Sequence, residues 1–182
     1  MSDFLFALIG AALVSNLILG LPLAADALRS ARVQALGPAG ALLILLAAPS
    51  AWLLQQALQA VDLTYLSLLV SLPLLAALSW LSLALLARLR PALPLDGLWA
   101  LLLGNGLGAM LLARTLENFS TALALGIGGG LGFWLVLQLM SDLLERIEQC
   151  DVPAAFRGTP ILLIAAGLMS LAFLGFSGMG AA

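Results

Sequence analysis

The stretch Gly104-Asn105-Gly106-Leu107-Gly108 is a polar and flexible interruption inside an otherwise apolar run of the chain. A second asparagine, Asn16, lies 89 positions earlier, inside another apolar run. Interrupted spans at corresponding positions of two repeats are the best sequence indication of a functional centre in many membrane transporters. The two asparagines therefore indicate two diverged copies of one unit, approximately residues 1–89 and 90–182.

The same shift of 89 positions aligns further parts of the two halves. It places Ala124-Leu125-Gly126 on Ala35-Leu36-Gly37, and Gly129 on Gly40. Agreement at one common offset favours an internal repeat over chance matches between two apolar sequences. The alternative for the asparagines is that each only joins neighbouring helices by a hydrogen bond, as polar side chains in membrane helices often do.

The composition is that of an integral membrane protein. The chain has 182 residues, 63% of them hydrophobic and only 9% charged, with a mean hydropathy of +1.16. Soluble domains usually have about 25% charged residues. There is no His and one Cys, which excludes His-based metal sites and catalytic triads. The net charge of −2 offers no basic surface for nucleic acid.

Six charge-free runs have the character of membrane spans: Phe4–Ala25, Val33–Val61, Leu63–Ala87, Gly97–Ala113, Asn118–Ser141 and Gly158–Ala182. A helix needs about 20 apolar residues to cross the hydrocarbon core, and most runs reach that length. The fourth run is short, and the first contains Pro22, which lacks a backbone donor and favours a break. We therefore predict an all-α membrane domain of six transmembrane helices. The first helix of each repeat is expected to be interrupted, at Pro22 and at Gly104 and Gly106.

The arginines predict the orientation of these helices. Six of the seven follow the first, third or fifth run: Arg29, Arg32, Arg88, Arg90, Arg146 and Arg157. Only Arg114 lies on the other side. The positive-inside rule places the six in the cytoplasm and both termini in the periplasm. Because each half has three spans, an odd number, the two repeats are expected to run in opposite senses across the membrane.

Two further patterns limit the function. All nine carboxylates lie at span ends or in loops, whereas ion carriers usually have an ionisable group within the membrane. The chain is therefore not expected to carry protons or sodium by itself. Gly126 with Gly130, and Gly128 with Gly132, have GxxxG spacing, which favours close helix packing over a ligand-binding role.

The C-terminal third resembles a known family. Asp151-Val152-Pro153-Ala154-Ala155-Phe156-Arg157-Gly158 and the segment 166–178 closely resemble the end of the A-type subunit of the Rnf (Rsx) complex. The resemblance continues more weakly through Leu63-Thr64-Tyr65-Leu66 and Val14-Ser15-Asn16. The related sodium-pumping NADH:quinone oxidoreductase has homologous paired subunits. The resemblance implies six spans, an inverted repeat and a place in an inner-membrane translocase that couples ferredoxin–NAD electron transfer to ion transport.

The family also implies a [2Fe–2S] cluster held within the membrane by one Cys from each interrupted helix and by a partner subunit. Gly106 stands where the second Cys is expected, and Leu19-Gly20-Leu21-Pro22 lacks the first. Cys150 lies in the loop before Asp151, at the membrane edge. We therefore expect no cofactor, no metal and no catalytic residue on this chain.

Two functions follow from this resemblance and its departures. In the first, the chain is a membrane subunit of an Rnf-type ion-translocating oxidoreductase, bound to its homologous paired subunit and to membrane lipid, and non-catalytic alone. In the second, it is a structural or assembly paralogue, or a repurposed carrier, that has lost the redox role. The candidate site is the pair Asn16 and Asn105 near the membrane midplane. Arg157 is expected to support assembly, and the alternative is a plain positive-inside anchor.

Overall fold

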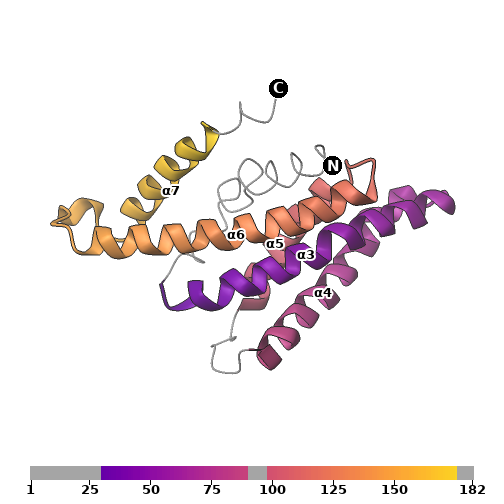
Figure 1. The fold of residues 1–182 in the computed structure, drawn as a ribbon, viewed down its shortest axis with the longest axis horizontal. Helices are drawn as coiled ribbons and strands as arrows, with labels where there is room; N and C mark the ends of the chain where they lie inside the picture. The colour runs from indigo at the N-terminus through magenta and orange to yellow at the C-terminus, as the bar shows by residue number, and fades with distance from the viewer. Residues whose placement is uncertain (1–29, 90–97, 176–182) are drawn as a thin grey trace.

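The computed structural model describes residues 30–89 and 98–175, and every regular element in these ranges is helical (Figure 1). The α-helices are α3 (Ser30–Ala60), α4 (Ser67–Leu89), α5 (Leu98–Ala113), α6 (Phe119–Glu148) and α7 (Thr159–Leu174). Two short 3-10 helices, η2 (Thr64–Leu66) and η3 (Ala154–Phe156), precede α4 and α7. A helix pairs its backbone N–H and C=O groups within one segment, as a hydrocarbon environment demands.

Within residues 30–89 and 98–175, three helical segments are long and apolar enough to cross a membrane: Ala35–Ala60, Thr64–Leu89 and Phe119–Glu148. Helices α5 and α7 are also apolar but have 16 residues each, which is about 24 Å of helix at 1.5 Å per residue. For five of the six predicted runs, a helix begins within a few residues of the start of the run. The first run, Phe4–Ala25, lies outside the described residues.

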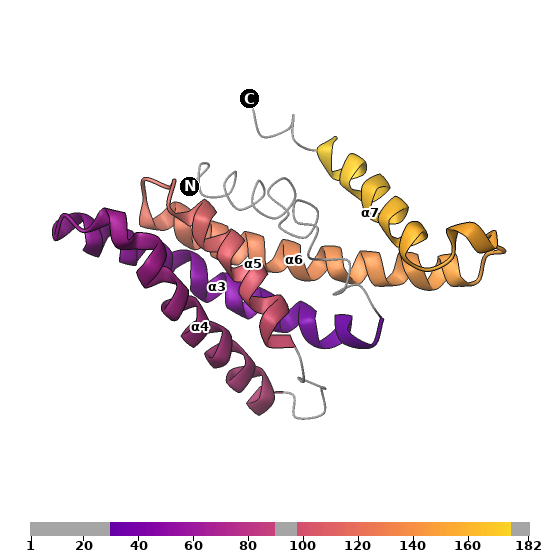
Figure 2. The same ribbon diagram turned by 180° about the vertical axis from the view of Figure 1, so that it is seen from behind.

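Helix α3 is central, because it packs against α4, α5 and α6. Helix α6 lies along α3 in the opposite direction, and α5 covers one side of this pair (Figures 1 and 2). Most of the fully buried side chains belong to α3, α5 and α6. Among the described α-helices, α7 makes substantial contact only with α6, and half of its described large apolar side chains are exposed.

A tight turn joins α3 to α4. Asp62 has a φ of 56°, and the N–H of Leu63 donates to the carbonyl oxygen of Leu58 over 2.9 Å. This is the Schellman arrangement that ends a helix with one residue in the left-handed region. The two helices lie close together at this turn and diverge toward Leu89, the last residue of α4 (Figures 1 and 2).

The expected interruption of the fourth span is wrong. Helix α5 is one continuous α-helix from Leu98 to Ala113 and includes the whole stretch Gly104–Gly108. Leaving this helix would expose unpaired backbone groups, each at a cost of several kcal/mol in hydrocarbon. Three glycines do not offset that cost, and the small size of one of them, Gly106, allows close packing against Leu75 and Leu43 instead. The shortness of the span is confirmed, and Pro22 lies outside the described residues.

Helix α6 continues beyond its apolar part, as far as Glu148. Its last two turns expose Asp142, Glu145 and Arg146. On the other face Leu143, Leu144 and Ile147 pack against the core. The helix therefore extends about 10 Å past Ser141 at 1.5 Å per residue, and it carries the loop that leads to α7.

Candidate functional site

Asn105 is the most buried amide of the described residues. Its side chain is 6% exposed, and the other buried polar residues of the described ranges are all serines of α4. Those serines are satisfied locally: Ser79 donates to the carbonyl oxygen of Leu75 over 2.8 Å, within its own helix. The side-chain amide of Asn105 forms no hydrogen bond with another described residue. Asn16 lies outside the described residues, so the pairing of the two asparagines stays a prediction.

Gly106 lies where α5 approaches both α3 and α4. A β-carbon added there would overlap Cδ1 of Leu75 and would lie 2.8 Å from Cδ2 of Leu43. Leu75 and Leu43 are both almost fully buried, so any side chain at this position has to displace two packed leucines. The glycine next to Asn105 therefore serves close helix packing.

Helices α3 and α6 also approach closely through glycine. A β-carbon at Gly130 would lie 2.7 Å from the carbonyl oxygen of Ala41, and one at Gly126 would lie 3.1 Å from that of Leu45. Pro49 has no N–H to bond the Leu45 carbonyl in the normal helical pattern, so this oxygen faces the bare Cα of Gly126. The predicted packing role of Gly126 and Gly130 is confirmed.

Arg114, which the sequence marks only as an indicator of topology, joins two helices through hydrogen bonds. Its guanidinium donates to the carbonyl oxygen of Ser67 over 2.8 Å, to Oγ of Ser71 over 2.8 Å and to Oγ of Ser67 over 3.3 Å. The three bonds join the residue after α5 to the first two turns of α4. Two signals in the sequence could have revealed it: Arg114 is the one arginine on its side, and Ser67 and Ser71 are four residues apart on one helix face.

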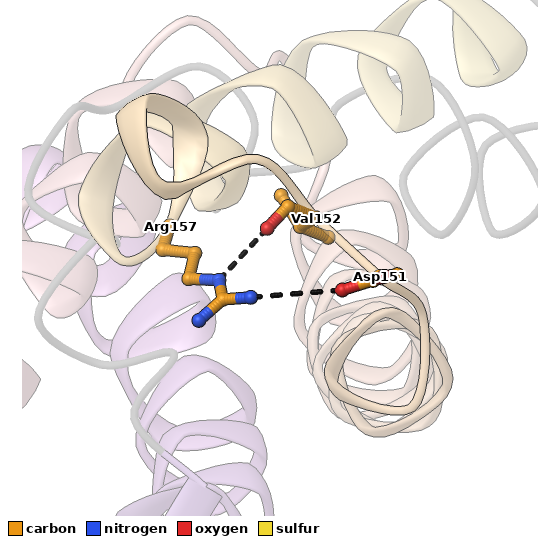
Figure 3. A network of polar contacts seen from close by, with 3 residues as sticks. All are labelled: Asp151, Val152 and Arg157. Carbon is orange, nitrogen blue, oxygen red and sulfur yellow. Dashed lines mark hydrogen bonds and ion pairs between the residues drawn. The ribbon is translucent and has the colours of Figure 1, made fainter.

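Arg157 lies in the loop between α6 and α7, away from the residues around Asn105. Its Nε donates to the carbonyl oxygen of Val152 over 2.8 Å, and one terminal nitrogen lies 3.7 Å from a carboxylate oxygen of Asp151 (Figure 3). Both charged side chains are largely exposed, and exposed pairs of this kind contribute little to stability. The arginine therefore shapes the loop, and most of its guanidinium surface is open to a partner.

The residues present do not fit the [2Fe–2S] cluster that the resemblance implies. Cluster iron is normally held by four cysteine thiolates. Gly106 has no thiol, and its surroundings are filled by Leu75 and Leu43. Cys150 is exposed and donates to the carbonyl oxygen of Arg146 over 3.4 Å, beyond the end of α6. Within the described ranges, no three His, Cys, Asp or Glu side chains form a group able to hold a metal ion.

These features define a polytopic integral membrane protein, with apolar helices and charges confined to helix ends and loops. The family model described as "Rnf-Nqr subunit, membrane protein" matches residues 7–180, and the chain belongs to this family.

Individual relatives are similar over almost the whole chain. Those from Cereibacter sphaeroides and Citrobacter koseri are 33% and 36% identical over 190 residues, covering 98% of this chain and 98% of each relative. A relative from Tolumonas auensis is 54% identical over 74 residues, covering 40% of this chain and 38% of its own length. All three are named as the A-type subunit of an ion-translocating oxidoreductase complex.

Proposed function

We propose that this chain is the A-type membrane subunit of an Rnf-type complex that couples ferredoxin–NAD electron transfer to ion transport across the bacterial inner membrane. The observation that carries the proposal is similarity at 33–36% identity over 98% of the chain to relatives named as this subunit. None of the described residues places an ionisable side chain in the interior of a span. The ion-coupled chemistry is therefore assigned to the complex. Its partners are the other membrane subunits, especially its homologous paired subunit.

The proposed architecture is two inverted three-helix repeats, and contacts between α3 and α6 support it. A β-carbon at Gly37 would lie 2.7 Å from Trp134, and one at Gly126 would lie 3.5 Å from Cα of Leu45. Gly126 is the repeat counterpart of Gly37, and Leu45 is the counterpart of Trp134, at the offset of 89. The first contact is thus repeated with the roles of the two helices exchanged.

A second pair of contacts follows the same rule. A β-carbon at Gly40 would overlap the ring of Phe133, and one at its counterpart Gly129 would lie 3.4 Å from Cγ2 of Ile44. Ile44 is in turn the counterpart of Phe133. Exchanged contacts of this kind are expected when a two-fold axis relates two antiparallel helices, and inverted repeats are related by such an axis in the membrane plane.

The proposed axis passes between Ala41 and Gly130. These residues are each other's counterparts, and the Ala41 carbonyl oxygen lies 2.7 Å from the position of a β-carbon at Gly130. We propose that this axis relates the two halves of the chain, approximately residues 1–89 and 90–182.

The second candidate function is a structural or assembly paralogue that has lost the redox role. The observation that favours it is the filling of space around Gly106 by Leu75 and Leu43, where the family resemblance implies a thiolate. We propose that this chain contributes no ligand to an iron–sulfur cluster in either case. Arg157 is proposed to support assembly, because its guanidinium is held by the Val152 carbonyl and remains open on its outer side.

The two functions are separated by purifying the complex through a tag on this chain. Reconstituted into vesicles, the complex is expected to take up ions when reduced ferredoxin and NAD⁺ are supplied, and to lose this activity when the chain is deleted. An assembly role predicts a different result: once the complex has formed, depletion of the chain leaves ion uptake intact. Failure of the tag to retrieve other membrane subunits would contradict both functions.

A further inference from the structure

An apolar groove of about 380 Å³ lies between α3, α6 and the last turn of α4. Leu42 and Leu45 of α3, Leu86 and Leu89 of α4, and Leu131 and Trp134 of α6 form most of its wall. It exists because small residues bring α3 and α6 together at Ala41 and Gly130, while α4 diverges from α3 toward its end (Figures 1 and 2). Its size is in the range of small-molecule sites, about 300–1,000 Å³.

The wall of the groove is made of apolar side chains and small residues only. Water needs two to four polar partners to be held in a cavity, and an empty groove forfeits the dispersion contacts of its walls. In a membrane the occupant that satisfies such a wall is a hydrocarbon chain.

A positively charged residue, Arg88, lies next in sequence to the α4 end of the groove. Arg88 immediately precedes the groove residue Leu89 and is exposed. No carboxylate of the described residues lies within ion-pair distance of Arg88. The one ion pair between described residues joins Arg157 to Asp151. Long arginine side chains near helix ends extend toward the lipid headgroups. A guanidinium at this level is complementary to a phosphate.

We propose that this groove binds an acyl chain of an anionic phospholipid whose phosphate is bound by Arg88. The acyl chain lies against Leu131, Trp134 and the leucines of α3, and the lipid headgroup lies at the end of α4. The lipid fills the space between α4 and the α3–α6 pair, so it fixes the angle at which α4 diverges. This inference rests on the membrane location of the chain and not on the proposed function.

Trp134 makes the groove measurable, since its indole lines the wall and is 38% exposed. The purified full-length chain in detergent is titrated with phosphatidylglycerol carrying brominated acyl chains, which quench an indole they touch. The difference between the unmodified chain and Trp134→Phe isolates the signal of this residue. Quenching is expected to saturate at a stoichiometric amount of lipid.

Two variants test the place of binding. Leu131→Phe adds volume inside the groove and is expected to raise the half-saturating lipid concentration several-fold, and Leu42→Phe is expected to do the same from α3. Leu135→Phe is the matched control, because Leu135 is 50% exposed on α6 and Leu131 is 55% exposed, but only Leu131 lines the groove. Equal quenching curves for all three, without saturation, would mean bulk lipid contact only and would overturn the proposal.

A third variant tests the headgroup. Brominated phosphatidylcholine is expected to bind more weakly than phosphatidylglycerol, and Arg88→Gln is expected to abolish that difference. Equal binding of the two lipids to the unmodified chain would overturn the assignment of the phosphate to Arg88. The titration is repeated on the assembled complex. If Trp134 is then shielded from brominated lipid, a partner helix occupies the groove and the lipid proposal fails.

Discussion

Arg114 donates a hydrogen bond to the carbonyl oxygen of Ser67 over 2.8 Å, and this bond fastens the end of α5 to the start of α4. The same guanidinium donates to Oγ of Ser71, whose own hydroxyl donates to the carbonyl oxygen of Leu68 over 2.8 Å. The contact places the end of one antiparallel helix beside the beginning of the other. The contact fixes the position of the short helix α5 along α4, and this position determines the depth of Asn105 in the membrane.

We predict that Arg114→Ala lowers the free energy of unfolding by about 2 kcal/mol, because hydrogen bonds from a charged group contribute about 1.5–3 kcal/mol each and the guanidinium is partly exposed. The measurement is an SDS titration of the protein in mixed micelles. Arg146→Ala is the control, since Arg146 is exposed near the end of α6 and its side chain forms no hydrogen bond or ion pair with another described residue. Equal stabilities for the two variants would show that the hydrogen bonds of Arg114 to Ser67 and Ser71 do not stabilise the protein.

Gly130→Ala is predicted to destabilise the protein by about 1–3 kcal/mol, the usual cost of overpacking. The added β-carbon meets the Ala41 carbonyl oxygen at 2.7 Å, and a backbone oxygen cannot rotate away as a side chain does. Gly167→Ala on α7 is the control, because a β-carbon there meets nothing within 4 Å. That change is expected to be neutral or to stabilise by up to about 1 kcal/mol through the better helix propensity of alanine. Thermal unfolding in detergent compares them.

The sequence predicted the helices well because membrane spans are set by long apolar runs and by the charges between them. Val33–Val61 and Gly97–Ala113 correspond closely to α3 and α5. The interruption at Gly104–Gly108 was predicted wrongly, since glycine is typical both of broken helices and of close helix crossings. Only the positions of Leu43 and Leu75 against Gly106 distinguish the two cases.

Of the candidate pair, only Asn105 lies in the described residues, and it is buried. The pairing of Asn16 with Asn105 stays a prediction. The hydrogen bonds of Arg114 could not be predicted, because they join residues 43 and 47 positions apart and depend on how α5 lies against α4. The acceptor of the Arg157 guanidinium was equally open, since several loop carbonyls lie within its reach in sequence.

Cys150→Ser is predicted to leave the iron content of the purified complex unchanged, because this thiol is exposed beyond the end of α6 and lies outside the buried helix crossings. Iron is counted by atomic absorption and checked by electron paramagnetic resonance of the reduced complex. Gly106→Cys in combination with Leu75→Ala tests the packing argument, because it supplies both a thiol and the space for it. Loss of about two irons per complex in Cys150→Ser would show that the chain does ligate a cluster.

A periplasmic C-terminus is predicted because six arginines follow the first, third or fifth apolar run and only Arg114 follows the fourth. An alkaline phosphatase fusion after Ala182 is expected to be active, and a fluorescent protein exported unfolded at the same position is expected to be dark. A matched pair of fusions after Arg88 should give the opposite result. Active phosphatase at Arg88 together with inactive phosphatase at Ala182 would reverse the orientation of the chain.

Asn16 and Asn105 are predicted to act as a pair across the repeat axis. Asn105 is 6% exposed, and an amide without a partner in an apolar environment costs roughly 1–3 kcal/mol. Each amide both donates and accepts, so the two can satisfy one another if the inverted repeats bring the first span and α5 together. Alternatively, each amide only joins helices, in which case such bonds average about 0.6 kcal/mol.

The two possibilities give different results in reconstituted vesicles. If the pair lines the path of the ion, Asn16→Leu and Asn105→Leu each abolish ion uptake while the complex still assembles. If the asparagines only join helices, both variants and the double variant transport normally and lose little stability. The stability losses are informative separately: a double variant that loses less than the sum of the single losses indicates that the amides touch, because residues in contact are not additive. Full transport in all three variants would exclude a functional site at the midplane, and strictly additive losses would exclude direct contact between Asn16 and Asn105.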